Sequence, residues 1–396
     1  MNKLPSDWQI KTINEVCNIY TGNSINKKKK EENFIGLKEG LNYIGTKDIS
    51  FNNIIEYENG VKIPFKDLKD FEIAKSNTSL LCIEGGSAGR KIGFTNQDVC
   101  FGNKLCCFEA IEDEPKFIYF YLQSNYFLRE FNSNISGLIG GISKEKIKRI
   151  KIPIPPLEIQ KEIATRLDFS FDKIERGIKY LKLAKENIME YKQSRLKYAF
   201  EGKLTDCNNW EIKTLGEVCE ILDNIRKPIN ATERKQRLKK SNLRYAYYGA
   251  TGQIGYIDNF LFDFEAVLLG EDGAPFLEPF KNKAYIVSGK YLVNNHAHIL
   301  RAKDNISINK FLCYFLNTVD YMPYVSGTTR LKLNQFSMKQ IKIPIPPIET
   351  QKEIVSILDK SFKSMDEIER LNNENINNLL LLKKSLLKEA FSGRLI

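Results

Sequence analysis

The stretch Lys151-Ile152-Pro153-Ile154-Pro155-Pro156 opens a segment that occurs twice in this chain. The first copy ends at Ala199-Phe200-Glu201-Gly202-Lys203-Leu204. The second copy begins at Lys342-Ile343-Pro344-Ile345-Pro346-Pro347 and ends at Ala390-Phe391-Ser392-Gly393-Arg394-Leu395. Both ends are displaced by 191 residues (342 − 151 and 395 − 204), so the copies align without a net gap. A long repeat at a fixed offset indicates that the fold contains one structural unit twice.

Each copy predicts a long amphipathic helix that begins after its prolines. Proline lacks a backbone donor and restricts the residue before it, so the Pro-Pro pair marks the start of a helix and not its interior. Apolar residues then recur every three or four positions, which is the seam of a helix with near-heptad spacing. In the first copy these residues are Ile163, Leu167, Phe171, Ile174, Ile178 and Leu181. In the second copy Ile354, Leu358, Phe362 and Met365 begin the same seam, and Ile376, Leu379 and Leu386 resume it.

The length of these helices favours a spacer. Gly202 and Gly393 stand where a left-handed residue would end each helix. From Leu157 to Phe200 the first helix would extend roughly 65 Å at ~1.5 Å per residue. Ordinary core helices of a bundle rarely exceed about 25 residues. We therefore expect two long antiparallel helices that form a coiled coil.

The composition is that of a basic globular chain. Its 396 residues leave room for two or three domains, and its formal net charge of +11 suits a polyanionic partner. The eight cysteines form no CxxC pair, which argues against a zinc site or a disulfide framework. No run approaches the ~20 apolar residues of a membrane span, and the N-terminus lacks the apolar core of a signal peptide. We expect a soluble protein of a reducing cytoplasm that binds no membrane.

A shorter repeat frames the first one. Asp7–Cys17 (DWQIKTINEVC) returns as Asn209–Cys219 (NWEIKTLGEVC), so that Trp8 and Trp210 take matching positions. The chain therefore divides into a module, a helical spacer, a second module and a second spacer. Their ranges are 1–150, 151–206, 207–341 and 342–396.

Between their framing segments the two modules differ in sequence. Both carry short β-prone runs bounded by glycine or asparagine, such as Leu80–Ile83 and Ala266–Leu269. Helices are expected at Pro115–Phe131 and Asn309–Thr318. The predicted fold class is α+β: two modules with mixed, β-rich sheets, separated by the two long helices in a pseudo-two-fold repeat. The framing segments of the two modules match, whereas the sequences between them differ. This pattern indicates two modules that share one scaffold and recognise different targets.

Signatures of catalysis are largely absent. The sequence has no GxxxxGK[ST] loop for a nucleoside triphosphate and no GxGxxG loop for a dinucleotide. Its two histidines, His296 and His298, would face one side of a strand, but a zinc site needs a further protein ligand. We therefore assign no catalytic and no metal-binding residue. We expect the histidines to form hydrogen bonds, either inside the module or to DNA.

Several basic or polar segments are candidates for contact with nucleic acid. Lys27–Lys30 and Arg234–Lys240 are basic runs that suit phosphate contact or a solvated surface. Ser326–Asn334 (SGTTRLKLN) combines hydroxyl, amide and basic groups, and Ile135–Lys144 holds the matching place in the first module. Arginine can bind guanine, and asparagine adenine, through two hydrogen bonds each.

These repeats resemble the specificity (S) subunit of type I restriction–modification systems. The resemblance rests on the duplicated Ile-Pro-Ile-Pro-Pro-x-Glu-x-Gln-Lys-Glu-Ile at 152–163 and 343–354, the helix after each copy, and the Trp-x-Ile-Lys-Thr frame. In the second module, Tyr247–Gly252, Gly270–Gly273 and Asn294–His296 are similar to one common class of target-recognition domain. The first module matches more loosely, through Tyr43–Ile49 and the Gly85–Arg90 cluster.

The resemblance implies a protein without catalysis of its own. Two target-recognition domains would each recognise one half of a split sequence in double-stranded DNA, and the paired helices would set the gap between the halves. Methyltransferase (M) subunits, two per chain, would dock on the helices and methylate adenine, and motor-nuclease (R) subunits would join for restriction. S-adenosylmethionine, ATP and Mg²⁺ would be bound by these partners, and no cofactor by this chain.

The motifs give two sets of candidate site residues. The residues expected to contact DNA are Lys47, Ser87, Arg90, Lys91, Ser136, Lys144, Tyr247, Tyr248, Thr251, Asn294, Asn295, His296, Thr328, Arg330 and Lys332. The residues expected to bind partner helices are Ile163, Leu167, Phe171, Ile354, Leu358 and Phe362.

Two other functions stay open at the level of sequence. A stand-alone DNA methyltransferase or nuclease with an unrecognised site would modify or cut DNA without any partner. A coiled-coil scaffold for proteins would lack the salt-sensitive affinity for duplex DNA that a specificity subunit requires.

Overall fold

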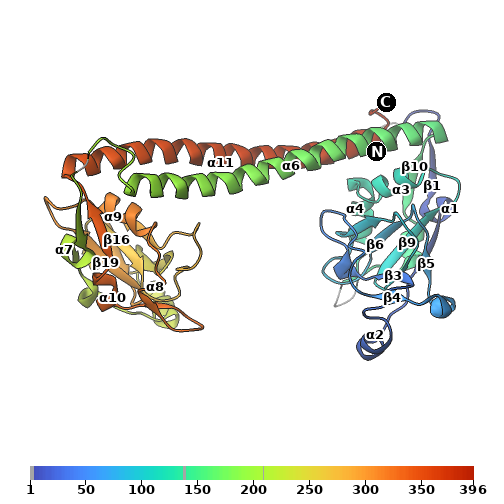
Figure 1. Cartoon of the computed structure of the whole chain (residues 1–396). Helices are drawn as coiled ribbons and strands as arrows, with labels where there is room; N and C mark the ends of the chain where they lie inside the picture. Colours follow the sequence, from blue (N-terminus) through green and yellow to red (C-terminus); the bar gives the residue numbers. More distant parts are fainter. Residues whose placement is uncertain (1–3, 137–139, 208) are drawn as a thin grey trace. The chain divides into compact units, whose positions relative to one another are not determined.

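The structure, a computed structural model, describes residues 4–136, 140–207 and 209–396, and it forms two compact units (Figure 1). Unit 1 comprises Met1–Tyr180 with Asn375–Ile396, and unit 2 comprises Leu181–Glu374. Each unit therefore contains one module, the start of the helix that follows it, and the end of the helix that follows the other module.

A two-stranded ladder joins the start of each module to its proline segment. In unit 1, β1 (Gln9–Thr12) pairs antiparallel with β10 (Lys151–Ile154), and the short helix α1 (Ile13–Val16) follows β1. Glu15 Oε2 accepts hydrogen bonds from the N–H and the hydroxyl of Thr12, each at 2.6 Å. A carboxylate placed in this way satisfies donors that the first turn of a helix leaves free.

Unit 2 repeats this arrangement. There β11 (Glu211–Thr214) pairs with β22 (Lys342–Ile345), and α7 (Leu215–Val218) follows β11. Glu217 Oε2 accepts from the N–H and the hydroxyl of Thr214 at 2.6 and 2.7 Å. The Thr-x-x-Glu spacing of the shorter repeat therefore encodes one helix start in both units.

Two four-stranded sheets form the body of the module in unit 1. Their strand orders are β2-β9-β6-β7 and β4-β3-β8-β5. The strands are β2 (Cys17–Thr21), β3 (Leu41–Ile44), β4 (Lys62–Ile63), β5 (Ile73–Ala74), β6 (Ser79–Cys82), β7 (Ile92–Phe94), β8 (Val99–Phe101) and β9 (Leu105–Ala110).

The module of unit 2 has the same topology despite its different sequence. Its sheets have the orders β12-β19-β16-β17 and β14-β13-β18-β15, and β3 with β8 and β13 with β18 are the matching parallel pairs. A small β20-β21 ladder is added. The strands are β12 (Cys219–Ile221), β13 (Tyr245–Gly249), β14 (Gly252–Ile257), β15 (Phe262–Asp263), β16 (Ala266–Gly270), β17 (Ala284–Val287), β18 (Lys290–Val293), β19 (Ala297–Ala302), β20 (Val325–Ser326) and β21 (Lys332–Leu333). The modules thus differ in side chains and loops and agree in strand order.

The helix predicted over 115–131 is two helices in the structure, α3 (Pro115–Tyr121) and α4 (Asn125–Ser133). The break is local, because the Ser124 hydroxyl accepts from Phe127 N and starts a new helix. The helix predicted from Asn309 is confirmed as α9 (Asn309–Leu316). The remaining helices are α2 (Lys27–Asn33), α5 (Lys144–Lys148), α8 (Ala231–Lys240) and α10 (Gln335–Lys339), with 3₁₀ turns at Thr46–Asp48, Phe65–Asp70 and Asp223–Ile225.

The two predicted long helices are α6 (Leu157–Phe200) and α11 (Ile348–Ala390). In unit 1, Lys383 Nζ lies 2.6 Å from Glu175 Oε1. In unit 2, Lys185 pairs with Glu369 at 3.1 Å and Lys192 with Asp366 at 2.5 Å. Contacts that ascend one helix while they descend the other show that the pair is antiparallel, as predicted.

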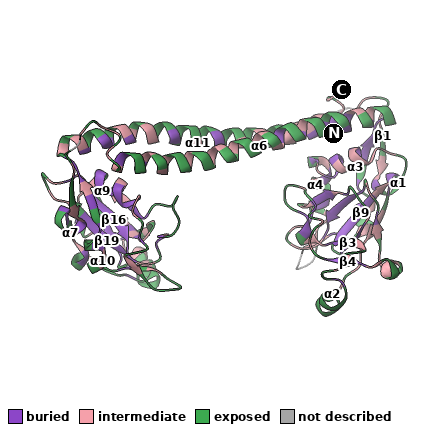
Figure 2. Ribbon diagram, in the orientation of Figure 1, coloured by how far each residue is buried: buried purple, intermediate pink, exposed green. Residues whose placement is uncertain are grey.

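Glycine ends both long helices, as the sequence predicts. Gly202 has φ +74 and Gly393 has φ +73, the left-handed conformation of a helix cap. Trp210 lies against Gly202 and Trp8 against Gly393, so each framing tryptophan packs on the end of a long helix. Figure 2 shows that buried residues are concentrated in the strands, whereas the long helices alternate buried and exposed positions.

Candidate nucleic-acid interface

Two loops that are far apart in sequence meet at one end of the module in unit 2. The first follows β16 and contains Glu271 and Asp272, and the second spans 326–334 before α10. Leu333 N donates to Glu271 O at 2.7 Å, and Asp272 forms a β-bridge with Lys332. The backbone therefore fixes the polar loop against the end of the sheet.

Ion pairs reinforce this junction. Arg330 Nη2 and His296 Nδ1 lie 2.9 and 2.5 Å from the same oxygen, Asp272 Oδ1. Lys332 Nζ lies 3.1 Å from Glu271 Oε1. The side chains of Arg330 and His296 remain 60% and 37% exposed. Asp272 thus orients two of the predicted DNA-contacting groups while it leaves their outer surfaces free.

A buried polar cluster lies behind the junction. His298 Nδ1 is 2.6 Å from Asp223 Oδ2, and its Nε2 is 2.8 Å from Leu333 O. Arg226 contacts the Glu271 carboxylate and lies 3.6 Å from Asp223 Oδ2. Both ring nitrogens of His298 therefore lie within hydrogen-bond distance of acceptor oxygens.

The charge of Asp223 is stabilised inside this cluster. Burial raises the pKa of the Asp223 carboxyl, but the hydrogen bond and the charge of His298 act against burial. Ile299 N also donates to Asp223, at 3.0 Å, and the net result is a pKa below the usual value. The carboxylate is therefore held in its ionised form.

The same cluster satisfies the spacing of a metal site. One ligand atom from each of Asp223, Glu271 and His298 lies within 4.8 Å of the others. Arg226 contacts both carboxylates, however, and supplies the positive charge that a cation would bring. We interpret the cluster as a buried ion-pair network that fixes the loops.

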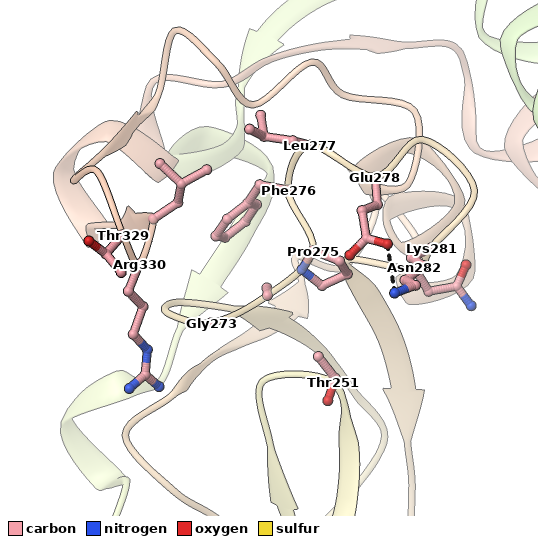
Figure 3. Close-up of a pocket in the computed structure, with 12 residues that line it drawn as sticks. Thr251, Gly273, Pro275, Phe276, Leu277, Glu278, Lys281, Asn282, Thr329 and Arg330 are labelled. Atoms are coloured by element: carbon pink, nitrogen blue, oxygen red, sulfur yellow. Dashed lines mark ion pairs between the residues drawn. The ribbon is translucent and has the colours of Figure 1, made fainter. Parts of the chain in front are cut away.

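A cavity of about 710 Å³ opens beside Arg330 (Figure 3). Its lining includes Thr251, Phe276, Thr329 and Arg330, which come from three different loops. Gly273 has φ +66, and a Cβ on it would lie 3.2 Å from the guanidinium of Arg330. The left-handed backbone therefore favours glycine here, and a larger residue would also displace the Arg330 side chain.

The structure separates the residues predicted to contact DNA in unit 2 into exposed and buried groups. The exposed or partly exposed residues are Tyr248, Thr251, Asn295, His296, Thr328, Arg330 and Lys332. The prediction is wrong for Tyr247, which is 1% exposed and whose hydroxyl accepts from Ile229 N at 3.0 Å. Asn294 is also buried, and its Oδ1 accepts from His296 N at 2.9 Å. Burial makes these two residues supports of the interface, because neither side chain can reach DNA.

Unit 1 brings the equivalent loops together. Gly85 N donates to Gly140 O at 2.7 Å, which joins the cluster after β6 to the loop at 135–144, the predicted counterpart of 326–334. Arg90 and Lys91 place their charged groups 4.9 and 5.0 Å from the ring centre of Phe51, which is itself 58% exposed. The junction in unit 1 is therefore aromatic and cationic, where that of unit 2 is ionic.

All six residues of unit 1 that the sequence predicted to contact DNA are exposed or partly exposed. They are Lys47, Ser87, Arg90, Lys91, Ser136 and Lys144. The tip of the second loop, residues 137–139, lies outside the described residues.

The sequence did not identify the residues that hold these groups in place. Glu271 and Asp272 stand in a Gly-Glu-Asp-Gly run. The two carboxylates of this run are the sequence signal from which ion pairs with the basic loop at 326–334 could have been predicted. Phe51 offers no local signal, because its role depends on the distant Arg90 and Lys91.

Comparison with known proteins identifies the family. The model of the type I restriction modification DNA specificity domain matches this chain twice, at residues 5–182 and 208–378. The chain belongs to this family. The two matches contain the two modules and their loop junctions.

Curated relatives within the specificity family agree. A putative type I restriction enzyme specificity subunit of Haemophilus influenzae is 37% identical over 164 residues, which cover 40% of this chain and 39% of that protein. The StySPI specificity subunit of Salmonella potsdam is 24% identical, with 99% of this chain and 90% of that protein covered. The EcoBI specificity subunit of Escherichia coli is 22% identical, covering 98% and 86%.

Solved structures share the fold. A chain from a study of complex assembly and conformational transition in a type I R-M system has a TM-score of 0.76 at 16% identity, with both chains covered in full. The HsdS subunit from Thermoanaerobacter tengcongensis has a TM-score of 0.57 at 18% identity, with 99% of this chain and 98% of that chain covered.

The structure corrects the predicted partner-binding residues of this specificity-family chain. Ile163, Leu167 and Phe171 are buried in the core of unit 1. Ile354 and Leu358 are buried in the core of unit 2, and Phe362 packs on Tyr314 with ring centres 5.4 Å apart. The spacing of these apolar residues correctly predicts a helix face that makes contacts. The chain's own modules and helices cover that face, and not a partner protein.

A different set of apolar side chains on α6 is exposed, two of them (Phe169 and Tyr180) in unit 1 and three (Leu183, Tyr191 and Tyr198) in unit 2. Its members are spaced by 11, 3, 8 and 7 residues, which at about 100° per residue puts them on one side of the helix. They are Phe169, Tyr180, Leu183, Tyr191 and Tyr198, and each is at least 45% exposed.

Among the described helices none has the length and apolar character needed to cross a membrane.

Proposed function

We propose that this chain is the sequence-recognising subunit of a type I restriction–modification complex, and that each module recognises one half of a bipartite DNA target. The observation that carries the proposal is the pair of loop junctions. Both units place the same two loops together on the same topology, yet one junction presents Arg330 and His296 held by Asp272, and the other presents Arg90 and Lys91 on Phe51. One scaffold with unlike contact groups suits the recognition of two unlike half-sites.

The exposed stripe on α6 supports docking of methyltransferase subunits on the long helices. Aromatic and leucine side chains in a helical stripe suit the groove of a partner helix pair. We propose that two such subunits bind per chain and that motor-nuclease subunits join them. The methyl donor, ATP and Mg²⁺ would then be bound by the partners. The cytoplasmic location expected from the sequence stays a prediction.

Co-expression of the chain with its methyltransferase subunits, followed by methylome sequencing, tests the proposal. We expect methylated adenines at one split motif. Replacing residues 219–334 with those of another family member should change one half of the motif and leave the other half intact. Methylation or cleavage by the purified chain alone would contradict the proposal, and so would affinity for DNA that does not respond to salt.

A further inference from the structure

Unit 1 contains a cleft that is lined by four basic side chains. None of the residues that the sequence predicted to contact DNA is among its lining residues. Its volume is about 690 Å³. The basic residues are Arg129 on α4, Arg149 at the end of α5, Lys151 at the start of β10 and Lys388 near the end of α11. Glu130 is the single acidic residue within this described lining.

The four cations are not paired with a carboxylate in the described part of the chain, and Glu130 is the one acid in the described lining of the cleft. None of them forms an ion pair within 4.0 Å there, although Lys383, on the same helix as Lys388, pairs with Glu175 at 2.6 Å. Like charges that line a concave surface repel one another and concentrate the positive potential. The guanidinium groups of Arg129 and Arg149 also have the planar geometry that fits phosphate oxygens. The cleft therefore suits an anion from outside the chain.

The scaffold does not require the two arginines. The repeat offset of 191 residues matches Lys151 with Lys342 and Lys388 with Lys197, so the two lysines belong to the shared frame. The same offset maps Arg149 onto Gln340, and each of these two residues ends a five-residue helix at the same place in its unit. Arg129 stands on α4, and the fully described span 309–341 of unit 2 has no helix between α9 and α10 to match it. Two arginines added in one unit to a frame that both units share point to a role specific to unit 1.

We propose that this cleft binds phosphate groups of the DNA backbone outside the bases that the first module recognises. The inference rests on the proposed function, because DNA is the polyanion that function supplies. Contacts to phosphate fix the orientation of a protein on the duplex without carrying sequence information. Each neutralised phosphate also releases counterions, which makes the contact visible in the salt dependence of binding.

The test measures binding of the full chain, assembled with its methyltransferase subunits, to labelled duplexes by fluorescence anisotropy over a series of salt concentrations. One duplex carries the target and the other a scrambled sequence. For the double variant Arg129→Gln/Arg149→Gln we expect the Kd for both duplexes to rise by the same factor, so that their ratio is unchanged. The slope of log affinity against log salt should fall by about 2, close to one per lost phosphate contact.

Two features of the design separate loss of contact from loss of structure. Arg149→Gln introduces the residue that unit 2 carries at the matching position, so the frame tolerates it. Lys384→Gln is the matched control, because Lys384 is exposed on α11, four residues before Lys388, and does not line the cleft. The control should keep the wild-type Kd and slope.

An unchanged Kd and slope in the double variant would overturn the inference. Two further measurements would then identify another ligand for the cleft. Weaker assembly with methyltransferase subunits at unchanged DNA affinity would assign the cleft to an acidic protein surface. Binding of sodium triphosphate that the variant loses at unchanged DNA affinity would assign it to a free polyphosphate. A wild-type complex that does not prefer the target duplex would instead refute the proposed function, while the change in slope would still decide the inference.

Discussion

Glu271 is the residue whose charge the junction of unit 2 depends on most. Its carboxylate contacts Arg226 and lies 3.1 Å from Lys332 Nζ and 3.8 Å from His298 Nδ1. Glu271→Gln keeps the shape but removes the carboxylate charge beside buried Arg226, which retains only Asp223 at 3.6 Å, so we expect unit 2 to lose about 3 kcal/mol of stability. Faster amide exchange in β21 and β16 would report the loss. Glu220→Gln, an exposed position on β12, should change stability by less than about 0.5 kcal/mol.

Asp223 predicts how the stability of unit 2 depends on pH. Its pKa is lowered in the folded chain, so the stability it contributes is complete above the unfolded value of about 3.9 and is lost as pH falls through the folded pKa. We expect Asp223→Asn to lower the stability of unit 2 at neutral pH and to flatten its loss below about pH 4. Thermal unfolding of both proteins over a pH series checks this. Curves that stay parallel below pH 4 would show that Asp223 is not the group responsible.

At the scale of the element, the stripe on α6 predicts a selective loss of assembly. Leu183 is 49% exposed on the stripe, and its neighbour Lys182 is exposed about 100° away around the helix. Leu183→Asp should weaken the association of methyltransferase subunits by about tenfold, because it places a charge in an apolar contact. DNA binding by the chain itself should not change. Lys182→Asp introduces the same side chain off the stripe and should assemble normally in analytical ultracentrifugation.

The helices also show how far a sequence pattern can be followed. The seam of Ile163 and Leu167 predicted both the helix and its apolar face, because helical periodicity depends on local spacing alone. It could not tell which neighbour covers that face, since the covering surface comes from distant parts of the chain. The same limit explains Tyr247, which the motif placed at the interface and the fold buries in a sheet. The support of Arg330 by Asp272 likewise depends on two loops meeting in space.

At the scale of the whole molecule, the structural repeat extends beyond the segments that are similar in sequence. The offset of 191 residues and the framing repeat predicted the two long helices and the division into modules, and the structure adds the two ladders that join each frame to its proline segment. The module interiors have little sequence in common, yet their strand orders are the same. Sheet topology is held by buried apolar residues that many sequences satisfy, whereas the loops at the sheet ends vary freely. Conserved topology with divergent loops is therefore what allows one scaffold to recognise two sequences.

The long helices make a prediction about the whole molecule. Four helical residues inserted before Lys185 on α6 and four after its partner Glu369 on α11 keep the pairing and lengthen both helices by about 6 Å. At ~3.4 Å per base pair, the preferred gap between the half-sites should grow by one or two base pairs. The half-sites themselves should not change, because the loop junctions are untouched. Methylome sequencing of cells that carry the lengthened chain measures both quantities. A fixed gap with altered half-sites would show that the helices do not set the distance.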